Sequence, residues 1–295
     1  SMAAKFDRKF ILILGVSAVA AAAVVGVALA ILQPWGAARH VRRAEAAVAE
    51  GNWRQAFAFY GRAFGKEPGN IAYLDLTRDA LLKMVPETAT EASERYQTLR
   101  TIMDRRTRVG SPDPERWRDY LEFIETQAIA LDDSGSWNAL AEQAELMADS
   151  FGSGDPTRDL AEEYRCFARA QRLDALRSDE LETLEGDLEA LTERRTDSDR
   201  AWGTLARLRI LDGVGLAGGG RRLEAAERLA EAEETLEAAA AANAEGVELL
   251  LARLELAKHR VAIGEADPIE IDALVEAIGE AAARVDSSQS LRLAR

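Results

Sequence analysis

Apolar residues recur every three or four positions along almost the whole chain, which is the spacing of one face of an α-helix. Two clear stripes are Leu181, Leu184, Leu188 and Leu191, and Val247, Leu250, Leu251, Leu254 and Val261. Ala, Leu, Glu and Arg dominate the composition, and these residues favour helices. The alternating pattern of a β-strand is found nowhere, so the sequence predicts an all-α fold.

Short breaks divide this pattern into segments of helical length. Asp113-Pro114, Asp155-Pro156 and Asp267-Pro268 each place a capping carboxylate before a proline that suits the first helical position. Together with glycine-rich and asparagine-rich breaks, they predict helices near 38–50, 53–66, 71–84, 90–108, 114–131, 136–150, 156–175, 178–195, 198–211, 220–243, 245–263 and 268–285. The short connections indicate antiparallel helix pairs.

Residues 37–70 show a more specific pattern. It comprises Gly51, Trp53, Ala56, Tyr60, Ala63 and Pro68. A glycine permits a tight turn, small residues let two helices approach, aromatic residues fill the space between helix pairs, and a proline ends the second helix. In this register the segment resembles a tetratricopeptide repeat, a helix–turn–helix unit of about 34 residues.

The resemblance implies a TPR-like α-solenoid of antiparallel helix pairs over residues 37–295. The first helix departs from the family pattern, with His40, Arg43, Ala44 and Ala47 at its signature positions. Later segments repeat the pattern loosely, and a plain helical bundle remains the alternative.

A separate feature precedes this domain. Phe10–Leu32 contains no charged residue, and at about 1.5 Å per residue a helix of this length crosses the roughly 30 Å core of a bilayer. The sequence therefore predicts a short basic segment over 1–9, one transmembrane helix over 10–32 and an interfacial linker over 33–36. A cleaved signal peptide is the alternative, with Ala28-Leu29-Ala30 as a small-residue cleavage site.

The basic residues Lys5, Arg8 and Lys9 favour a cytoplasmic N-terminus, although Arg39, Arg42 and Arg43 follow the apolar run. The expected localisation is a single-pass protein of a bacterial inner membrane, with the soluble domain in the periplasm. Small residues at four-residue spacing, Ala18, Ala22, Gly26 and Ala30, would allow two anchors to form a homodimer.

The charge of the chain limits its partners. Its formal net charge is −14, which repels nucleic acid and excludes it as an expected partner. Cys166 is the single cysteine and lies in an apolar helical stretch, so we expect it to pack in the core.

No set of residues indicates catalysis. The spacing of Gly213, Gly215 and Gly218 fits a dinucleotide-binding loop, but no strand precedes it, so we expect a flexible loop between helices. His40 and His259 are far apart in the sequence and neither has a helical metal-binding partner. We therefore predict no catalytic residue, no cofactor and no metal, and a protein that is not an enzyme.

The remaining prediction is a membrane-anchored scaffold or adaptor that binds another protein. In the best repeat, Val41, Glu45 and Val48 occupy the groove side of the first helix and would contact a basic or amphipathic segment. An assembly or accessory factor of a membrane enzyme complex, or a cytosol-facing organelle receptor, is the alternative. Ser287–Leu293 resembles the cap and first turn of another helix, which leaves a domain truncated at its C-terminus and a domain that ends here as two equal alternatives.

Overall fold

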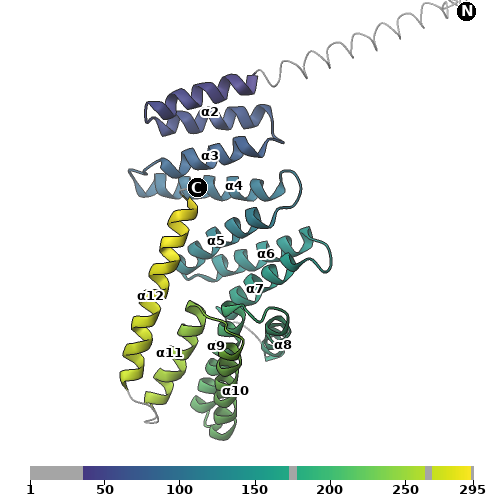
Figure 1. Ribbon diagram of the computed structural model, residues 1–295, viewed down its shortest axis with the longest axis vertical. Helices are drawn as coiled ribbons and strands as arrows, with labels where there is room; N and C mark the ends of the chain where they lie inside the picture. Colours follow the sequence, from purple (N-terminus) through teal and green to yellow (C-terminus); the bar gives the residue numbers. More distant parts are fainter. Residues whose placement is uncertain (1–35, 173–177, 263–267, 294–295) are drawn as a thin grey trace, which may run out of the picture. The chain divides into compact units, whose positions relative to one another are not determined.

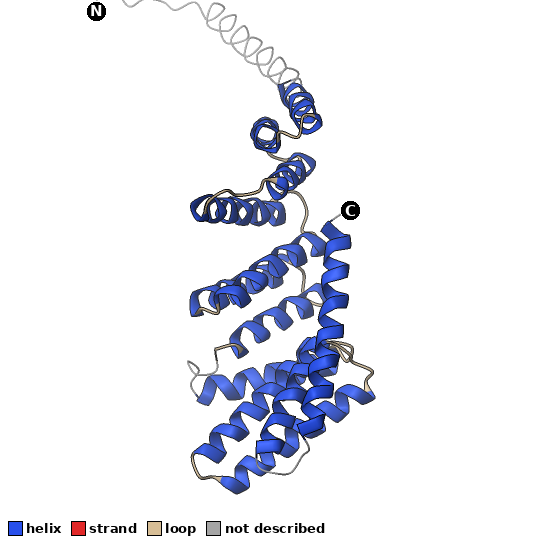
Figure 2. Ribbon diagram, turned by 90° about the vertical axis from the view of Figure 1, so that its left-hand side faces the viewer, coloured by secondary structure: helices blue, strands red, loops and turns tan. Residues whose placement is uncertain are grey.

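The computed structural model describes residues 36–172, 178–262 and 268–293, and every regular element within these ranges is an α-helix (Figures 1 and 2). The helices are 36–49, α2 (Trp53–Lys66), α3 (Ile71–Lys83), α4 (Ala89–Arg108), α5 (Pro114–Leu131), α6 (Ser134–Ser150), α7 (Pro156–Ala170), α8 (Ser178–Arg194), α9 (Asp199–Gly218), α10 (Arg222–Ala241), α11 (Val247–Ala262) and α12 (Pro268–Leu293). The predicted all-α fold is confirmed for the described residues, and most helix ends agree closely with the sequence prediction.

The chain divides into two compact units, with the boundary between Tyr120 and Leu121 inside α5. The first unit contains the described helices up to the beginning of α5, and the second contains the remainder of α5 and α6 to α12. The single continuous domain over 37–295 stays a prediction.

The first helix pair, 36–49 and α2, packs around small residues. Ala44, Ala47, Ala56 and Tyr60 form a buried cluster with Ala80 of α3. Between the helices, Gly51 adopts φ +72°, a conformation that glycine reaches without steric cost. Asn52 then caps α2, because its side chain accepts a hydrogen bond from the backbone of Gln55. Of the other residues in the repeat pattern, Ala63 is buried, Trp53 is half-buried and Pro68 is exposed.

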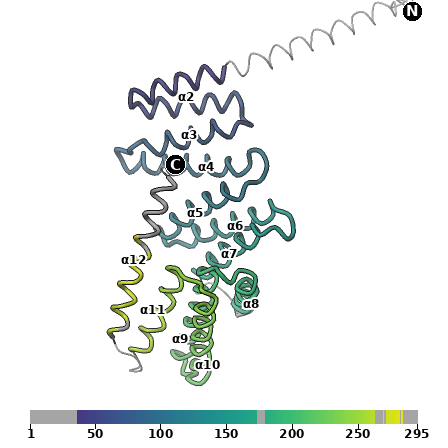
Figure 3. Tube along the Cα trace, viewed as in Figure 1, coloured from purple at the N-terminus to yellow at the C-terminus, as the bar shows by residue number. Residues whose placement is uncertain are grey.

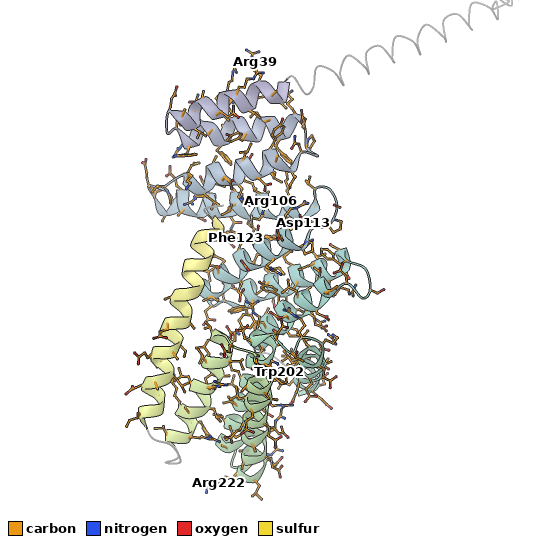
Figure 4. The ribbon with its side chains drawn as sticks, in the orientation of Figure 1. Arg39, Arg106, Asp113, Phe123, Trp202 and Arg222 are labelled. Atoms are coloured by element: carbon orange, nitrogen blue, oxygen red, sulfur yellow. The ribbon has the colours of Figure 1, made fainter. Side chains whose placement is uncertain are left out.

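An Asp-Pro-x-Arg turn connects α4 to α5. The Asp113 carboxylate accepts hydrogen bonds from the first turn of α5, and Pro114 begins the helix. The Arg116 side chain reaches back and donates to the carbonyl oxygens of Arg106 (3.1 Å) and Val109 (2.7 Å). Figure 4 labels Arg106 and Asp113 on the two sides of this turn. One side chain thus satisfies carbonyl groups that the end of α4 leaves without helical partners.

The same turn connects α6 to α7. Asp155 caps the helix, Pro156 begins it, and Arg158 donates to the carbonyl oxygens of Ala148 (3.0 Å) and Phe151 (3.1 Å). In both turns the arginine bonds the residues ten and seven positions before it. This recurring connection makes consecutive helices fold back on each other.

Helix α9 is the centre of the second unit, since α7, α8, α10 and α11 all pack against it. Figure 3 traces the chain through these helices. On one side, Leu205 and Leu208 contact Cys166, Leu184 and Leu188. On the other, Ala206 and Ile210 join a buried cluster from α10 and α11, against which Trp202 packs, as labelled in Figure 4.

The predicted loop over Gly213–Gly218 is wrong, because α9 continues through it to Gly218. Gly213 is buried, and a Cβ placed on it would lie only 3.0 Å from the Leu229 Cγ of α10. Close packing of α10 on α9 overrides the low helix propensity of glycine. Both the dinucleotide-binding interpretation and the flexible-loop interpretation of these glycines are therefore excluded.

No helix within residues 36–172, 178–262 and 268–293 is both long enough and apolar enough to cross a membrane. The longer helices, such as α4 and α10, carry many charged side chains. This finding contradicts the predicted localisation as a single-pass inner-membrane protein. The predicted anchor Phe10–Leu32 and its small-residue face lie outside the described residues.

Candidate interaction surfaces

The surface predicted for partner binding lies on helix 36–49. Val41 and Val48 are half-buried and pack against the cluster formed by Ala44, Ala47, Ala56, Tyr60 and Ala80. Glu45 is exposed. Its charge adds to the effect of burial, which raises the pKa of Tyr60. The two valines are thus partly used for packing within the repeat, and partner binding at these residues stays a prediction.

A groove lies between α10 and α11 in the second unit. Both helices pack on α9 but touch each other at few positions, so a space of about 240 Å³ remains between them. Its lining consists of Glu233, Leu236, Glu237, Ala240, Arg253, Leu256, Ala257, Arg260 and Leu274. Leu274 belongs to α12, which packs on α11. We call this space the α10–α11 groove.

The floor of the α10–α11 groove is apolar and its rim is charged. Leu236 and Leu256 also belong to the buried core cluster beneath, so the floor is continuous with a packed core. The two acidic residues, Glu233 and Glu237, come from α10, and the two basic residues, Arg253 and Arg260, come from α11. Arg260 forms an ion pair with Glu233 across the groove.

A second concentration of polar groups surrounds Arg200, at the start of α9. Its guanidinium lies 3.0 Å from the Glu125 carboxylate of α5 and 3.9 Å from that of Glu163 in α7. The guanidinium carbon also lies 4.3 Å from the ring centre of Tyr164 and 5.0 Å from that of Phe167. One side chain therefore links α5, α7 and α9.

Glu163 of α7 belongs to the same network and connects it to the residues just before α9. Its Oε2 accepts hydrogen bonds from Ser198 Oγ (2.8 Å) and Arg195 Nη1 (2.6 Å), and Ser198 in turn caps α9. Both oxygens of Glu163 are thus engaged by positive or donating groups.

Burial shapes the electrostatics of this region. Burial raises the pKa of Glu125, although the Arg200 charge acts in the opposite direction. Burial also raises the pKa of Asp199, next to Arg200, and of Glu248 in α11. Because the guanidinium is already in contact with Glu125 and two rings, we interpret the arrangement as a structural link between helices.

The other sequence candidates have packing roles. Cys166 is fully buried, and burial raises the pKa of its thiol to about 12, so the reactive thiolate is not formed near neutral pH. His40 stacks on Phe59, with ring centres 6.3 Å apart, and His259 lies in α11. In the part of the chain that the structure describes, no three His, Cys, Asp or Glu side chains are grouped as metal ligands.

The α10–α11 groove could not be predicted from the sequence pattern. Its apolar residues follow the same helical spacing as the core residues, and Glu233 and Arg260 are twenty-seven positions apart. The one sequence feature related to the groove is the many alanines of α10, which leave room beside the helix where large apolar side chains would fill it.

No protein-family model matches this chain, and no curated protein matches it. Among solved structures, the chain is similar to YrrB, described as a TPR protein with an unusual peptide-binding site. The two are 14% identical with a TM-score of 0.40, and the match covers 72% of this chain and 90% of that chain. A likeness at this level does not assign the chain to a family.

Proposed function

We propose that this protein is a protein-interaction scaffold that binds an amphipathic segment of a partner protein in the α10–α11 groove. The observation that supports this most directly is the combination of an apolar floor and a charged rim in one open space between two helices. Amphipathic helices bind such grooves by inserting apolar side chains between polar contacts at the edges.

The size of the groove favours a side chain over a metabolite. Its volume of about 240 Å³ lies below the roughly 300–1,000 Å³ of pockets that enclose small molecules. Its floor is built from leucine and alanine, without the converging polar groups that orient a small substrate. One or two large apolar side chains of a partner would fill this space.

The charged rim would fix the orientation of a bound segment. Because the acidic residues Glu233 and Glu237 lie on α10 and the basic residues Arg253 and Arg260 on α11, a bound segment is oriented by opposite charges on its two sides. We expect lysine or arginine on the side facing α10, and aspartate or glutamate on the side facing α11. An accessory factor of an enzyme complex would bind its enzyme by the same chemistry.

A peptide library displayed on phage and selected on the immobilised full chain tests this proposal. We expect enriched peptides to carry one or two large apolar residues flanked by charges of both signs. Ala240 is exposed and lines the groove, so Ala240→Trp should fill it and abolish the enrichment. The matched control is Ala238→Trp, an exposed position on the same helix that does not line the groove.

A charge reversal provides an independent check. Glu237→Arg should weaken binding of the selected peptides and change the preferred charge on the α10 side, whereas Glu234→Arg, exposed and outside the groove, should not. Equal effects of both reversals, or peptides that still bind Ala240→Trp, would contradict the groove as the binding site.

A further inference from the structure

The first helix pair carries a charge opposite to that of the whole protein. Residues 36–66 contain six basic residues and two acidic residues, a net charge of +4 in a chain of −14. Helix α2 has no acidic residue, and helix 36–49 has only Glu45. The positive charge is therefore local and strong.

Two of these basic residues lie beside one aromatic ring. The guanidinium of Arg43 lies 5.9 Å and that of Arg62 lies 5.4 Å from the ring centre of Phe59. His40 stacks on the same ring. Two helices thus hold three nitrogen-rich side chains around one ring, and contact with the ring restricts the motion of both arginines. We call this the Phe59 surface.

The positive charges on this surface act on one another. The pKa of His40 is lowered by burial and then by the charges of Arg62, Arg43, Lys66 and Arg39. Its Nδ1 is buried without a hydrogen-bond partner among the described residues.

The arginines of the Phe59 surface are available to a ligand. Arg43 and Arg62 are exposed, as are Arg39 and Arg42 elsewhere on helix 36–49, and within the described ranges none of the four forms an ion pair. By contrast, Arg54 on the same pair of helices is paired with Glu91 at 3.2 Å. Positive charges held close together without counter-charges repel one another in the unbound protein. A bound anion would reduce this repulsion.

We propose that the Phe59 surface binds an acidic segment of a partner protein. Several separate guanidinium groups match several separate carboxylates, and each arginine can form paired hydrogen bonds with one carboxylate. The preceding residues of this chain do not supply the counter-charge, because residues 1–35 contain Asp7 as their single acidic residue.

Binding of a fluorescent oligoglutamate peptide to the full chain, measured by anisotropy, tests this inference. We expect Arg43→Gln combined with Arg62→Gln to weaken binding about tenfold or more, the size expected for charge-assisted hydrogen bonds. The matched control combines Arg105→Gln with Arg118→Gln, both exposed and outside the Phe59 surface. Equal weakening in the two variants would overturn the proposal.

The two histidines provide a readout that does not depend on mutation. On peptide binding, the NMR titration of His40 should move to higher pH, because the carboxylates offset the surrounding positive charges. The signal of His259 in α11 should show no peptide-dependent change. An unmoved His40 signal at saturating peptide would overturn the proposal.

Other occupants are separated by the same assay. Tighter binding of an oligonucleotide or of phosphatidylserine vesicles than of the peptide, at equal charge concentration, would overturn the choice of an acidic protein segment. The choice of an acidic protein segment would also be overturned if the chain associates with itself and the double variant Arg43→Gln with Arg62→Gln abolishes that association. Because the Phe59 surface and the α10–α11 groove share no residue, failure of either proposal leaves the other intact.

Discussion

Gly203 of α9 lies directly against the backbone of Glu248 in α11: a Cβ placed on Gly203 would come within 2.6 Å of the Glu248 carbonyl carbon. The three nearest atoms are the carbonyl carbon, the carbonyl oxygen and the Cβ of Glu248, all fixed by the backbone of α11, so they cannot move aside as the end of a flexible side chain would. This contact sets how closely α11 packs on α9, and the α10–α11 groove depends on that packing.

Gly203→Ala should therefore lower the free energy of unfolding by about 1–3 kcal/mol, the range for overpacking in a core. The control is Gly215→Ala, in the same helix but with open space around the glycine. This substitution should raise the free energy of unfolding by about 0.5–1 kcal/mol, because alanine favours a helix more than glycine does. Urea unfolding followed by circular dichroism measures both. A stabilising Gly203→Ala would contradict the close contact.

Arg116→Ala should destabilise the first unit by about 1–3 kcal/mol, because the carbonyl groups of Arg106 and Val109 lose their donor in a half-buried turn. Arg118→Ala, two positions along α5 and exposed, should change stability by less than about 0.5 kcal/mol. Thermal unfolding of the two variants gives the comparison, and equal melting temperatures would show that the turn does not depend on this side chain.

Arg200→Met should lower the free energy of unfolding by about 3–5 kcal/mol, because it leaves the buried Glu125 carboxylate without its partner. Adding Glu125→Gln should recover part of that loss, since the amide no longer places an unpaired charge in the interior. Arg194→Met removes two more exposed ion pairs, with Asp159 and Glu162, so a loss of about 1 kcal/mol or less is expected. A double variant no more stable than Arg200→Met would contradict the coupling.

Glu248→Gln should stabilise the second unit at neutral pH. Burial raises the pKa of Glu248 in the folded state, and the charges of Arg207 and Arg200 offset this only in part. A carboxyl with a raised folded pKa contributes stability that is present below its unfolded pKa and is lost as pH rises through the folded value. We therefore expect the variant to gain stability at pH 7 and none at pH 4.

Urea unfolding at a series of pH values measures this dependence, with Glu193→Gln on the exposed surface of α8 as the control. An unchanged difference between Glu248→Gln and the parent protein from pH 4 to pH 7 would contradict the raised pKa.

Helix positions could be predicted because their signals are local. Asp113, Pro114, Asp155 and Pro156 mark two helix starts from neighbouring residues alone, and the structure places helices where they indicate. Helix α9 is the exception. Its glycines predicted a loop, but close packing against α10 stabilises the helix through to Gly218. A local signal fails where a distant segment supplies the stabilising contact.

The candidate sites could not be predicted in the same way. Leu236 and Leu256 repeat at core spacing, and nothing in the sequence distinguishes a core leucine from one at the floor of a groove. Likewise, Arg43 looks like an ordinary exposed charge until the packing of helix 36–49 on α2 brings it to the Phe59 ring, beside Arg62.

The sequence by itself determined that the described chain forms amphipathic helices joined by short capped turns, because helical periodicity and capping depend on residues within a few positions of each other. Only the tertiary structure decided which apolar faces meet, which arginines find carboxylates and which remain exposed. Arg200 became a buried link while Arg62 stayed free of ion pairs, although both are arginines on helices. The reason is physical: burial and ion pairing depend on distances between helices, and those distances follow from close packing at contacts such as that of Gly203 with Glu248.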